Sequence, residues 1–256
     1  MLHLIAALSL TGAALAAPTS TAATCDRAFL QSQADTYVAA QAAGSAAGVQ
    51  TNSANFTYTQ NFKAATLSTG ILATPLKIDH NRTTLDTTQC ATFTELIITD
   101  SKNPHVIGTQ MRFGADGALT LMETLVTSTG DWLFNPAGTL KYAAPENWGP
   151  IDEAKRDTRA VIQAAADAYL DLFNDKNVKV PWGNPCARLE GGSYVQPSCN
   201  VGVPSGIKNV NRRYVIDEVT GSCDVFFDFA GADPDSHEFR VEGGKLRYVH
   251  TMTVMK

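Results

Sequence analysis

The sequence contains the same pattern twice. Ala34-Asp35-Thr36-Tyr37-Val38 matches Ala166-Asp167-Ala168-Tyr169-Leu170 at an offset of 132 residues (166 − 34), and Gly117-Ala118-Leu119 matches Gly244-Lys245-Leu246 at an offset of 127 (244 − 117). A nearly constant offset with small drifts is typical of a tandem duplication whose loops have changed length. We therefore expect two similar domains, at residues 25–130 and 151–256, joined by a Pro- and Gly-containing linker at residues 131–150.

The first residues have the pattern of a secretory signal. Residues 4–17 are apolar and rich in Leu and Ala, and Ala14-Leu15-Ala16 has the small-x-small form of a signal-peptidase site. The stretch is short for a bilayer-spanning helix, and no second one follows. We predict a signal peptide at residues 1–16, a secreted or secretory-pathway protein and no stable membrane span. A buried N-terminal helix is the alternative.

Cysteine usage fits that compartment. The chain has five cysteines, and in an oxidising environment most are expected to pair, which leaves one free. Cys186 and Cys199 flank a turn-like segment, and we expect them to pair. Cys90 and Cys223 match in the repeat, so each is expected to serve its own half. No Cys-x-x-Cys or His-rich spacing supports a metal site, and none is predicted.

Two further features concern the surface. Asn55-Phe56-Thr57 and Asn81-Arg82-Thr83 are N-glycosylation acceptors, which are meaningful only in a secreted chain. The formal net charge is −5 at pH 7. This mild acidity argues against nucleic acid or an anionic membrane as the partner.

Each half is expected to begin with a helix and to continue with strands. Apolar residues recur at three-to-four spacing from Phe29 to Val38 and from Val161 to Phe173, with Asp26 in the first turn of one helix and Asp152 or Asp157 at the start of the other. Extended segments are expected at residues 55–60, 83–86, 91–99, 106–113 and 118–128, and again at 187–190, 213–218, 223–229, 237–241 and 245–255. This is an α+β plan, in which a sheet coiled around a helix forms a cone with an apolar mouth, a common ligand site.

The pattern resembles the ketosteroid-isomerase-like, or SnoaL-like, cone fold. The resemblance lies in the helices around Asp35-x-Tyr37 and Asp167-x-Tyr169 and in the hairpins that end in the long last strands. More narrowly, residues 25–30, 212–218 and 226–228 resemble a secreted fungal family described only as a domain of unknown function. The broader group includes the ketosteroid-isomerase-like dimerising cyclases of maleidride polyketides. The resemblance implies tandem cones in fungal secondary metabolism, but the fold hosts isomerases, dehydratases, cyclases and non-enzymes.

The sharpest chemical signal lies on the last strand of each half. By strand alternation Glu123 is expected on one face with Leu119, Leu121 and Leu125. Its repeat partner His250 is expected on one face with Leu246, Tyr248 and Met252. A titratable group on an apolar face is costly to bury without a partner, and burial moves its pKa toward the range of a general acid or base. We predict Glu123 and His250 as catalytic candidates. The alternative is that they face outward or are hydrogen-bonded to a neighbouring Tyr or Arg.

Three further residues complete the predicted site. Asp228 lies in an otherwise apolar strand and matches Glu95 in the repeat, so it is either an inward site residue or the partner of an arginine. Arg213 matches Arg82, and both are interpreted as mainly structural because ion-pair networks also perturb titration. As a catalytic alternative, Tyr214 or Arg213 would polarise a carbonyl group and stabilise an enolate.

The remaining histidines and tyrosines are interpreted as structural. Tyr37 and Tyr169 are expected to point from helix into cone and to pack in the core. His80 is expected in a loop, and His105 and His237 near turns at related places of the repeat, without support as metal ligands. No phosphate-binding loop, nucleophile elbow or Cys–His pair stands out, and no cofactor is predicted.

The favoured interpretation is a cofactor-independent enzyme of secondary metabolism. It would bind an uncharged or acidic molecule of polyketide or terpenoid type, and would isomerise, dehydrate or cyclise it by proton transfer, alongside pathway partner proteins. The alternatives are a non-catalytic secreted binding protein and a carbohydrate-active lyase. A lyase requires aromatic platforms such as Trp132, Trp148 and Trp182 in an open groove, whereas catalysis by proton transfer requires an acid–base pair within reach of one ligand position.

Overall fold

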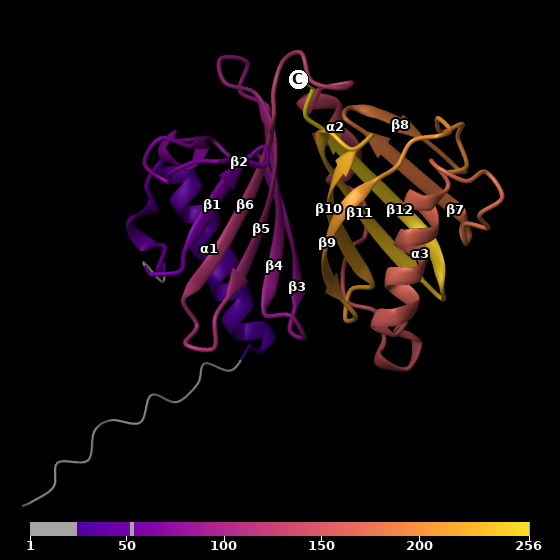
Figure 1. The fold of residues 1–256 in the computed structure, drawn as a ribbon, viewed down its shortest axis with the longest axis horizontal. Helices are drawn as coiled ribbons and strands as arrows, with labels where there is room; N and C mark the ends of the chain where they lie inside the picture. The colour runs from indigo at the N-terminus through magenta and orange to yellow at the C-terminus, as the bar shows by residue number, and fades with distance from the viewer. Residues whose placement is uncertain (1–24, 52–53, 256) are drawn as a thin grey trace, which may run out of the picture.

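The computed structural model describes residues 25–51 and 54–255. Within them the chain forms two similar halves, each with a helix and a curved six-stranded sheet (Figure 1). This confirms the predicted α+β class and the repetition. The predicted signal peptide at residues 1–16 lies outside the described residues.

The N-terminal half carries one long helix and one sheet. Its elements are α1 (Arg27–Ala43), η1 (Ala46–Gly48), β1 (Thr57–Gln60), β2 (Lys63–Ala64), η2 (Ile71–Ala73), β3 (His80–Asp86), β4 (Ala91–Ile98), β5 (His105–Phe113) and β6 (Leu119–Thr127).

The C-terminal half repeats this plan after a helical linker. Its elements are α2 (Pro136–Ala143), η3 (Glu153–Lys155), α3 (Arg159–Asp171), β7 (Trp182–Glu190), β8 (Ser193–Val195), β9 (Val210–Asp217), β10 (Ser222–Phe229), β11 (Asp233–Glu242) and β12 (Lys245–Thr253).

The two sheets have the same topology. The strand order β2-β1-β6-β5-β4-β3 recurs as β8-β7-β12-β11-β10-β9. In each sheet one pair is parallel, β1 with β6 and β7 with β12, and the other neighbours are antiparallel. Each strand therefore has a counterpart six strands later, so residues can be compared position by position.

The sheets face each other at the centre of the molecule, with α1 and α3 on the outer sides (Figure 1). One core lies between α1 and its sheet around Tyr37, and a second lies between α3 and its sheet around Tyr169. A third core joins the two sheets, where the rings of Phe93 and Phe226 meet edge to face at 6.0 Å, close to Met252. Because both sides of each sheet are covered, β4 is buried along its whole length.

Local sequence explains where the helices begin. The Asp26 side chain accepts a hydrogen bond from the Phe29 backbone N–H (2.8 Å), so Asp26 is the N-cap of α1 rather than a first-turn residue. Thr158 caps α3 in the same way, and the expected start at Asp152 or Asp157 is wrong. Asp157 instead accepts a hydrogen bond from the Gly244 N–H (2.9 Å), which ties the helix start to the β11–β12 turn.

The predicted linker is not irregular throughout. Asn135 caps α2, whose first residue is Pro136, a position where the missing N–H is harmless. This helix packs against β4, β7 and β8 and so covers one end of the inter-sheet core. His80, expected in a loop, is the first residue of β3.

Two disulfides hold the described chain. Cys186–Cys199 forms as predicted, and Cys25–Cys90 ties the start of α1 to the β3–β4 turn, while Cys223 is free and buried. Such bonds are typical of proteins that fold in an oxidising compartment, which fits the predicted secretory route. None of the helices in the described ranges is both long and apolar enough to span a membrane.

Candidate functional site

His250 and Glu123 lie between the two sheets, not on their helix-facing sides. A β-bulge between Arg112 and Phe113 in the β5–β6 pairing puts Leu119 on the α1 side, whereas Glu123 points toward the other sheet. The β11–β12 pairing has an equivalent bulge, so Leu246 packs under α3 while His250 faces the N-terminal half. Glu123 and His250 therefore do not share a face with Leu119 and Leu246, whereas Leu125 and Met252, which were also predicted on these faces, do lie in the inter-sheet core.

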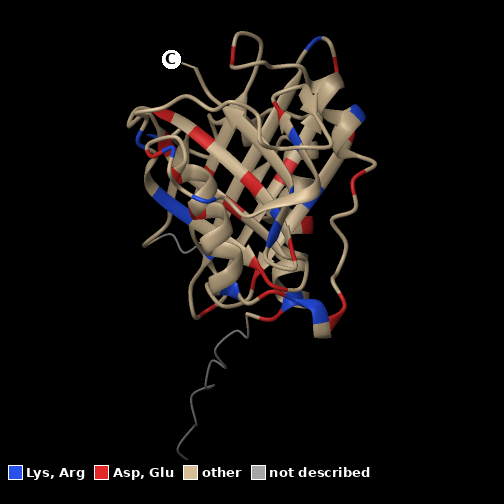
Figure 2. Cartoon of the chain, turned by 90° about the vertical axis from the view of Figure 1, so that its right-hand side faces the viewer, with Lys and Arg blue, Asp and Glu red and all other residues tan. Residues whose placement is uncertain are grey.

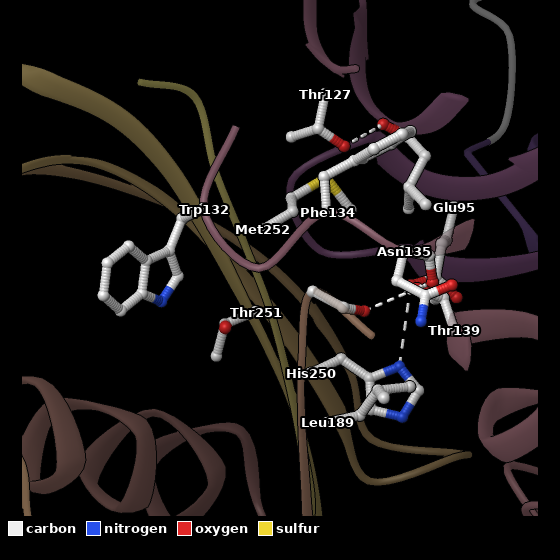
Figure 3. A pocket seen from close by; sticks show the side chains of 12 residues that line it. Glu95, Thr127, Trp132, Phe134, Asn135, Thr139, Leu189, His250, Thr251 and Met252 are labelled. Carbon is white, nitrogen blue, oxygen red and sulfur yellow. Dashed lines mark hydrogen bonds and ion pairs between the residues drawn. The ribbon is translucent and has the colours of Figure 1, made fainter. Parts of the chain in front are cut away.

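His250 belongs to a buried charged group that we call the inter-sheet cluster: Arg82, Glu95, Glu146, Glu238 and His250. The His250 Nε2 atom lies 2.6 Å from Glu146, and its Nδ1 atom lies 3.2 Å from Arg82 and 3.6 Å from Glu95. Figure 3 shows Glu95 pointing toward His250 beside the linker residues Asn135 and Thr139.

Arg82 sits at the centre of this cluster. Its guanidinium contacts Glu238 and lies 3.1 Å from Glu95, and it stacks 4.0 Å from the ring centroid of Trp148. Glu95, Glu238 and His250 have ligand atoms close enough for a metal ion, all within 4.8 Å of one another. Arg82 already supplies a cation among them, so the residues present do not fit a metal ion as well.

The pKa of His250 supports a structural role for the inter-sheet cluster. Burial lowers the pKa of His250, but contacts with Glu146 and Glu95 outweigh burial and raise it from 6.5 to about 9. An imidazolium at neutral pH is a cation in a network rather than a general base. The cavity beside His250 holds only about 10 Å³, at most the room of one water molecule.

Glu123 and Arg213 occupy the matching place across the sheet interface. The Arg213 Nε atom donates to Glu123 (3.0 Å), and the guanidinium lies 4.3 Å from the ring centroid of Phe62. By strand register Arg213 corresponds to Arg82 and Glu123 to His250. In both halves, therefore, an arginine at this position of the sheet contacts a side chain of the opposite sheet: Arg82 contacts His250, and Arg213 contacts Glu123.

The other two predicted site residues lie elsewhere. Asp228 accepts a hydrogen bond from Asn211 (2.6 Å) at the edge of the sheet. Its match to Glu95 is wrong, because Arg82 pairs with Glu95 across β3–β4 while Arg213 pairs with Phe226 across β9–β10. Tyr214 donates to Asp167 of α3 (2.6 Å), and burial followed by this contact raises its pKa. The five predicted residues thus do not surround one cavity.

A much larger pocket, of about 360 Å³, lies on the helix-facing side of the C-terminal sheet. We call it the C-terminal pocket. Figure 2 views this half from the α3 side and shows acidic and basic residues along its strands. The pocket lining combines apolar residues, among them Phe173, Ile207 and Phe229, with polar and charged ones. Its size lies in the range of pockets that hold small organic ligands.

Two strand residues form a buried acid–base pair in this pocket. Asp235 and His237 lie two residues apart on β11 and so share a face, and the His237 Nδ1 atom is 2.7 Å from an Asp235 oxygen. The second Asp235 oxygen accepts from the Thr253 hydroxyl (2.6 Å). Burial raises the pKa of Asp235, with His237 opposing the shift. Within the described part of the chain, no hydrogen-bond partner reaches His237 Nε2.

Two further donors lie beside this pair. Arg188 of β7 lines the pocket and forms an ion pair with Glu190 (3.1 Å), while its Nε atom has no partner among residues 25–51 and 54–255. The Tyr169 ring packs 5.5 Å from His237, and its hydroxyl is also unpartnered in the described ranges. Burial raises the pKa of Tyr169, so it remains a protonated donor. Buried donors without partners are rare and point to a site for a ligand oxygen.

The same positions in the N-terminal half carry no acid–base pair. By strand register His237 corresponds to Thr109 and Asp235 to Ile107. The Tyr37 hydroxyl, which matches the Tyr169 hydroxyl, is hydrogen-bonded to Thr109 (2.7 Å). Arg188 and Glu190 are replaced by Tyr58 and Gln60, which hydrogen-bond to each other (3.2 Å).

The N-terminal half also fills the space that is open in the C-terminal half. Gln60 accepts a hydrogen bond from the Ile71 backbone N–H (2.8 Å), which holds η2 against the sheet. Leu72 of η2 and the following Leu76 are fully or almost fully buried in the α1 core. The two halves thus share a fold but differ in their interiors, and the C-terminal half combines a pocket with titratable groups.

The tryptophans do not line one groove. Trp148 is buried against Tyr248 and Arg82 between the sheets, and Trp182 packs edge to face on Tyr169. Trp132 alone of the three lies at the rim of the C-terminal pocket, where its Nε1 donates to Glu190 (2.9 Å). Of the three tryptophans, Trp148 packs between the two halves, which is the alternative to a role in a carbohydrate-binding groove.

One comparison with known proteins bears on the pocket. A family model described as Domain of unknown function (DUF8021) matches residues 155–253. A search of the curated proteins finds no match to the chain. The matched segment runs from before α3 to the end of β12 and includes Tyr169, Arg188, Asp235 and His237. The C-terminal half, with its pocket, is therefore similar to this family of domains.

Proposed function

We propose that the C-terminal half is a ketosteroid-isomerase-like cone with an acid–base site, and that the protein is a cofactor-independent enzyme acting by proton transfer. The observation that carries this proposal is the unpartnered Nε2 of His237, held by Asp235 at a pocket of about 360 Å³. A base that is oriented by a buried carboxylate and opens onto an apolar cavity is the arrangement that general base catalysis requires.

The geometry supplies a role for each group. When Nδ1–H donates to Asp235, the Nε2 lone pair is free to accept a proton from a carbon next to a carbonyl group. Negative charge then develops on the carbonyl oxygen, where Arg188 and Tyr169 supply donors. Asp235 stabilises the imidazolium that forms. Return of the proton to another carbon completes an isomerisation. Expulsion of a hydroxyl group that takes the proton from His237 and leaves as water gives dehydration, and attack of the enolate carbon on a second carbonyl, whose oxygen takes that proton, gives cyclisation.

The biological setting extends the same proposal. We place the enzyme in the secretory pathway of an organism that makes polyketide-like secondary metabolites, with maleidride-type dimerising cyclisation as one form of the reaction. The sequence resemblance supports this setting, and the two disulfides are compatible with it.

The proposal is tested with a reporter for base catalysis at carbon. In 5-nitrobenzisoxazole a base removes the ring C–H proton while the N–O bond breaks, which gives a coloured nitrocyanophenolate. We expect the protein to accelerate this reaction and His237→Gln to lower the acceleration about 100-fold, since a positioned base contributes 10²–10⁴-fold. Absorbance of the product gives the rate.

The matched control is His105→Gln. His105 is a partly buried histidine on β5 whose ring bonds to Asn103 and to the Thr127 carbonyl, far from the pocket in sequence and in the other half. It is expected to retain the wild-type rate. Equal rates for wild type and a folded His237→Gln variant would contradict the proposal, and no acceleration at all by a protein that binds small apolar ketones would favour a binding protein.

A further inference from the structure

The charges around the C-terminal pocket constrain what it accepts. Two acidic residues of its lining, Glu190 and Asp235, stand against one permanently charged cation, Arg188. Arg188 is already paired with Glu190, and its side chain is 7% exposed. A carboxylate ligand would therefore enter a buried site with surplus negative charge, which is costly in a low-dielectric environment.

The unpartnered donors nevertheless call for an oxygen acceptor. Arg188 Nε is buried without a hydrogen-bond partner in the described ranges, and so is the Tyr169 hydroxyl. A neutral carbonyl oxygen accepts from such donors without adding net charge. The site thus favours an acceptor that is neutral on binding and becomes negative only during the reaction.

The rim of the pocket adds a shape requirement. Trp132, which is 48% exposed, is held at the mouth by its hydrogen bond to Glu190, and Met255 lies beside the same opening. Phe173 and Phe229 continue this apolar surface inward, with their rings edge to face at 5.8 Å. Aromatic side chains pack against a planar ligand either offset-stacked or edge to face.

We propose that the C-terminal pocket selects an uncharged, planar carbonyl compound, with its oxygen at Arg188 and the neighbouring C–H at His237, and that Glu190 excludes carboxylates. This substrate class rests on the proposed function. Glu190 acts as a specificity residue because it neutralises Arg188 and also fixes Trp132.

Two probes of the same shape test the selection. 2-Acetonaphthone is a neutral methyl ketone, and 2-naphthoate replaces its methyl group with a charged oxygen. We expect calorimetric titration at pH 7 to give a dissociation constant for the ketone at least about tenfold lower than that for the carboxylate. Glu190→Gln is expected to narrow this ratio severalfold by strengthening naphthoate binding. Glu153→Gln, an exposed carboxylate in η3, is the matched control and is expected to leave the ratio unchanged.

The outcomes separate this inference from the proposed function. The proposed selection of neutral ligands is wrong if naphthoate binds as tightly as acetonaphthone. It is also wrong if Glu190→Gln and Glu153→Gln give the same ratio of dissociation constants. Neither result contradicts the elimination that depends on His237. Binding of neither probe by a protein that retains that elimination also overturns the selection. If the wild-type protein neither binds the two probes nor accelerates the elimination, the proposed site itself is wrong.

Discussion

Replacing Arg82 with methionine is expected to lower the free energy of unfolding by about 3–5 kcal/mol, the usual cost of removing one partner from a buried ion-pair network. The variant leaves Glu95, Glu238 and Glu146 with His250 as their one remaining cation in the inter-sheet cluster. Methionine keeps much of the packing against Trp148, so the loss of charge dominates. Urea denaturation followed by tryptophan fluorescence measures the difference.

The repeat supplies a matched control for this substitution. Arg213 has the corresponding place but pairs with Glu123 alone, and its side chain is 27% exposed against 11% for Arg82. Arg213→Met is expected to cost about 1 kcal/mol or less, in line with partly exposed pairs. Adding Glu238→Gln to Arg82→Met is expected to recover part of the loss. Equal effects of the two arginine substitutions would show that the inter-sheet cluster has no special role.

The effect of Arg82→Met on the free energy of unfolding is also expected to depend on pH. Burial opposes ionisation of Glu95, but Arg82 and His250 outweigh it and lower its pKa to about 2. A pKa lowered by folding contributes stability that is present above the unfolded value near 4.5 and is lost as the pH falls toward 2. The stability difference between wild type and Arg82→Met is therefore expected to shrink over this range.

Asp235→Asn is expected to lower base-catalysed elimination of 5-nitrobenzisoxazole at least about 100-fold, although the side chain keeps its size. Asparagine can donate to His237 Nδ1, which places the ring proton on Nε2 and removes the lone pair that the reaction uses. An Asp-to-Asn change in the serine-protease triad acts through the same change of tautomer. The carbonyl oxygen of the asparagine then faces Thr253, whose hydroxyl continues to donate as it does to Asp235, so the fold is expected to hold.

Asp235 is a positioning residue, so its test needs more than a rate. Nitrogen NMR of His237 is expected to show Nδ1–H in the wild type and Nε2–H in Asp235→Asn. Asp228→Asn is the matched control, because Asp228 contacts Asn211 at the sheet edge and lies outside the lining of the C-terminal pocket. If Asp235→Asn keeps the wild-type rate with the tautomer changed, the assignment of His237 Nε2 as the base is wrong.

The fold could be predicted because its signals are local and occur twice. The repeated Asp-x-Tyr helices and the final strands fixed the α+β plan, and the short spacing of Cys186 and Cys199 predicted their bond, which is confirmed. Helix boundaries differ from the prediction where a capping side chain sets them, as at Thr158, which caps α3 in place of Asp152 or Asp157. The linker helix was missed because its stability comes from packing across two sheets rather than from its own eight residues.

The candidate site could not be predicted for two physical reasons. One bulge in each half puts Leu119 and Leu246 on the helix-facing side, while the later residues Glu123 and His250 point between the sheets. In addition, shorter loops reduce the repeat offset to 128 at β11 (237 − 109), which matches His237 to Thr109 rather than to His105. The available signal was Asp235-Ser236-His237, whose outer residues share a strand face with Phe239.

The proposed function requires a small molecule to bind in the C-terminal pocket, rather than at the inter-sheet cluster or in the N-terminal half. A crystal structure of the protein with 2-acetonaphthone tests it directly. We expect one molecule in the C-terminal pocket, with the carbonyl oxygen within hydrogen-bond distance of Arg188 and the methyl group beside His237 Nε2. A molecule bound beside His250, under α1 or only on the outer surface would contradict it.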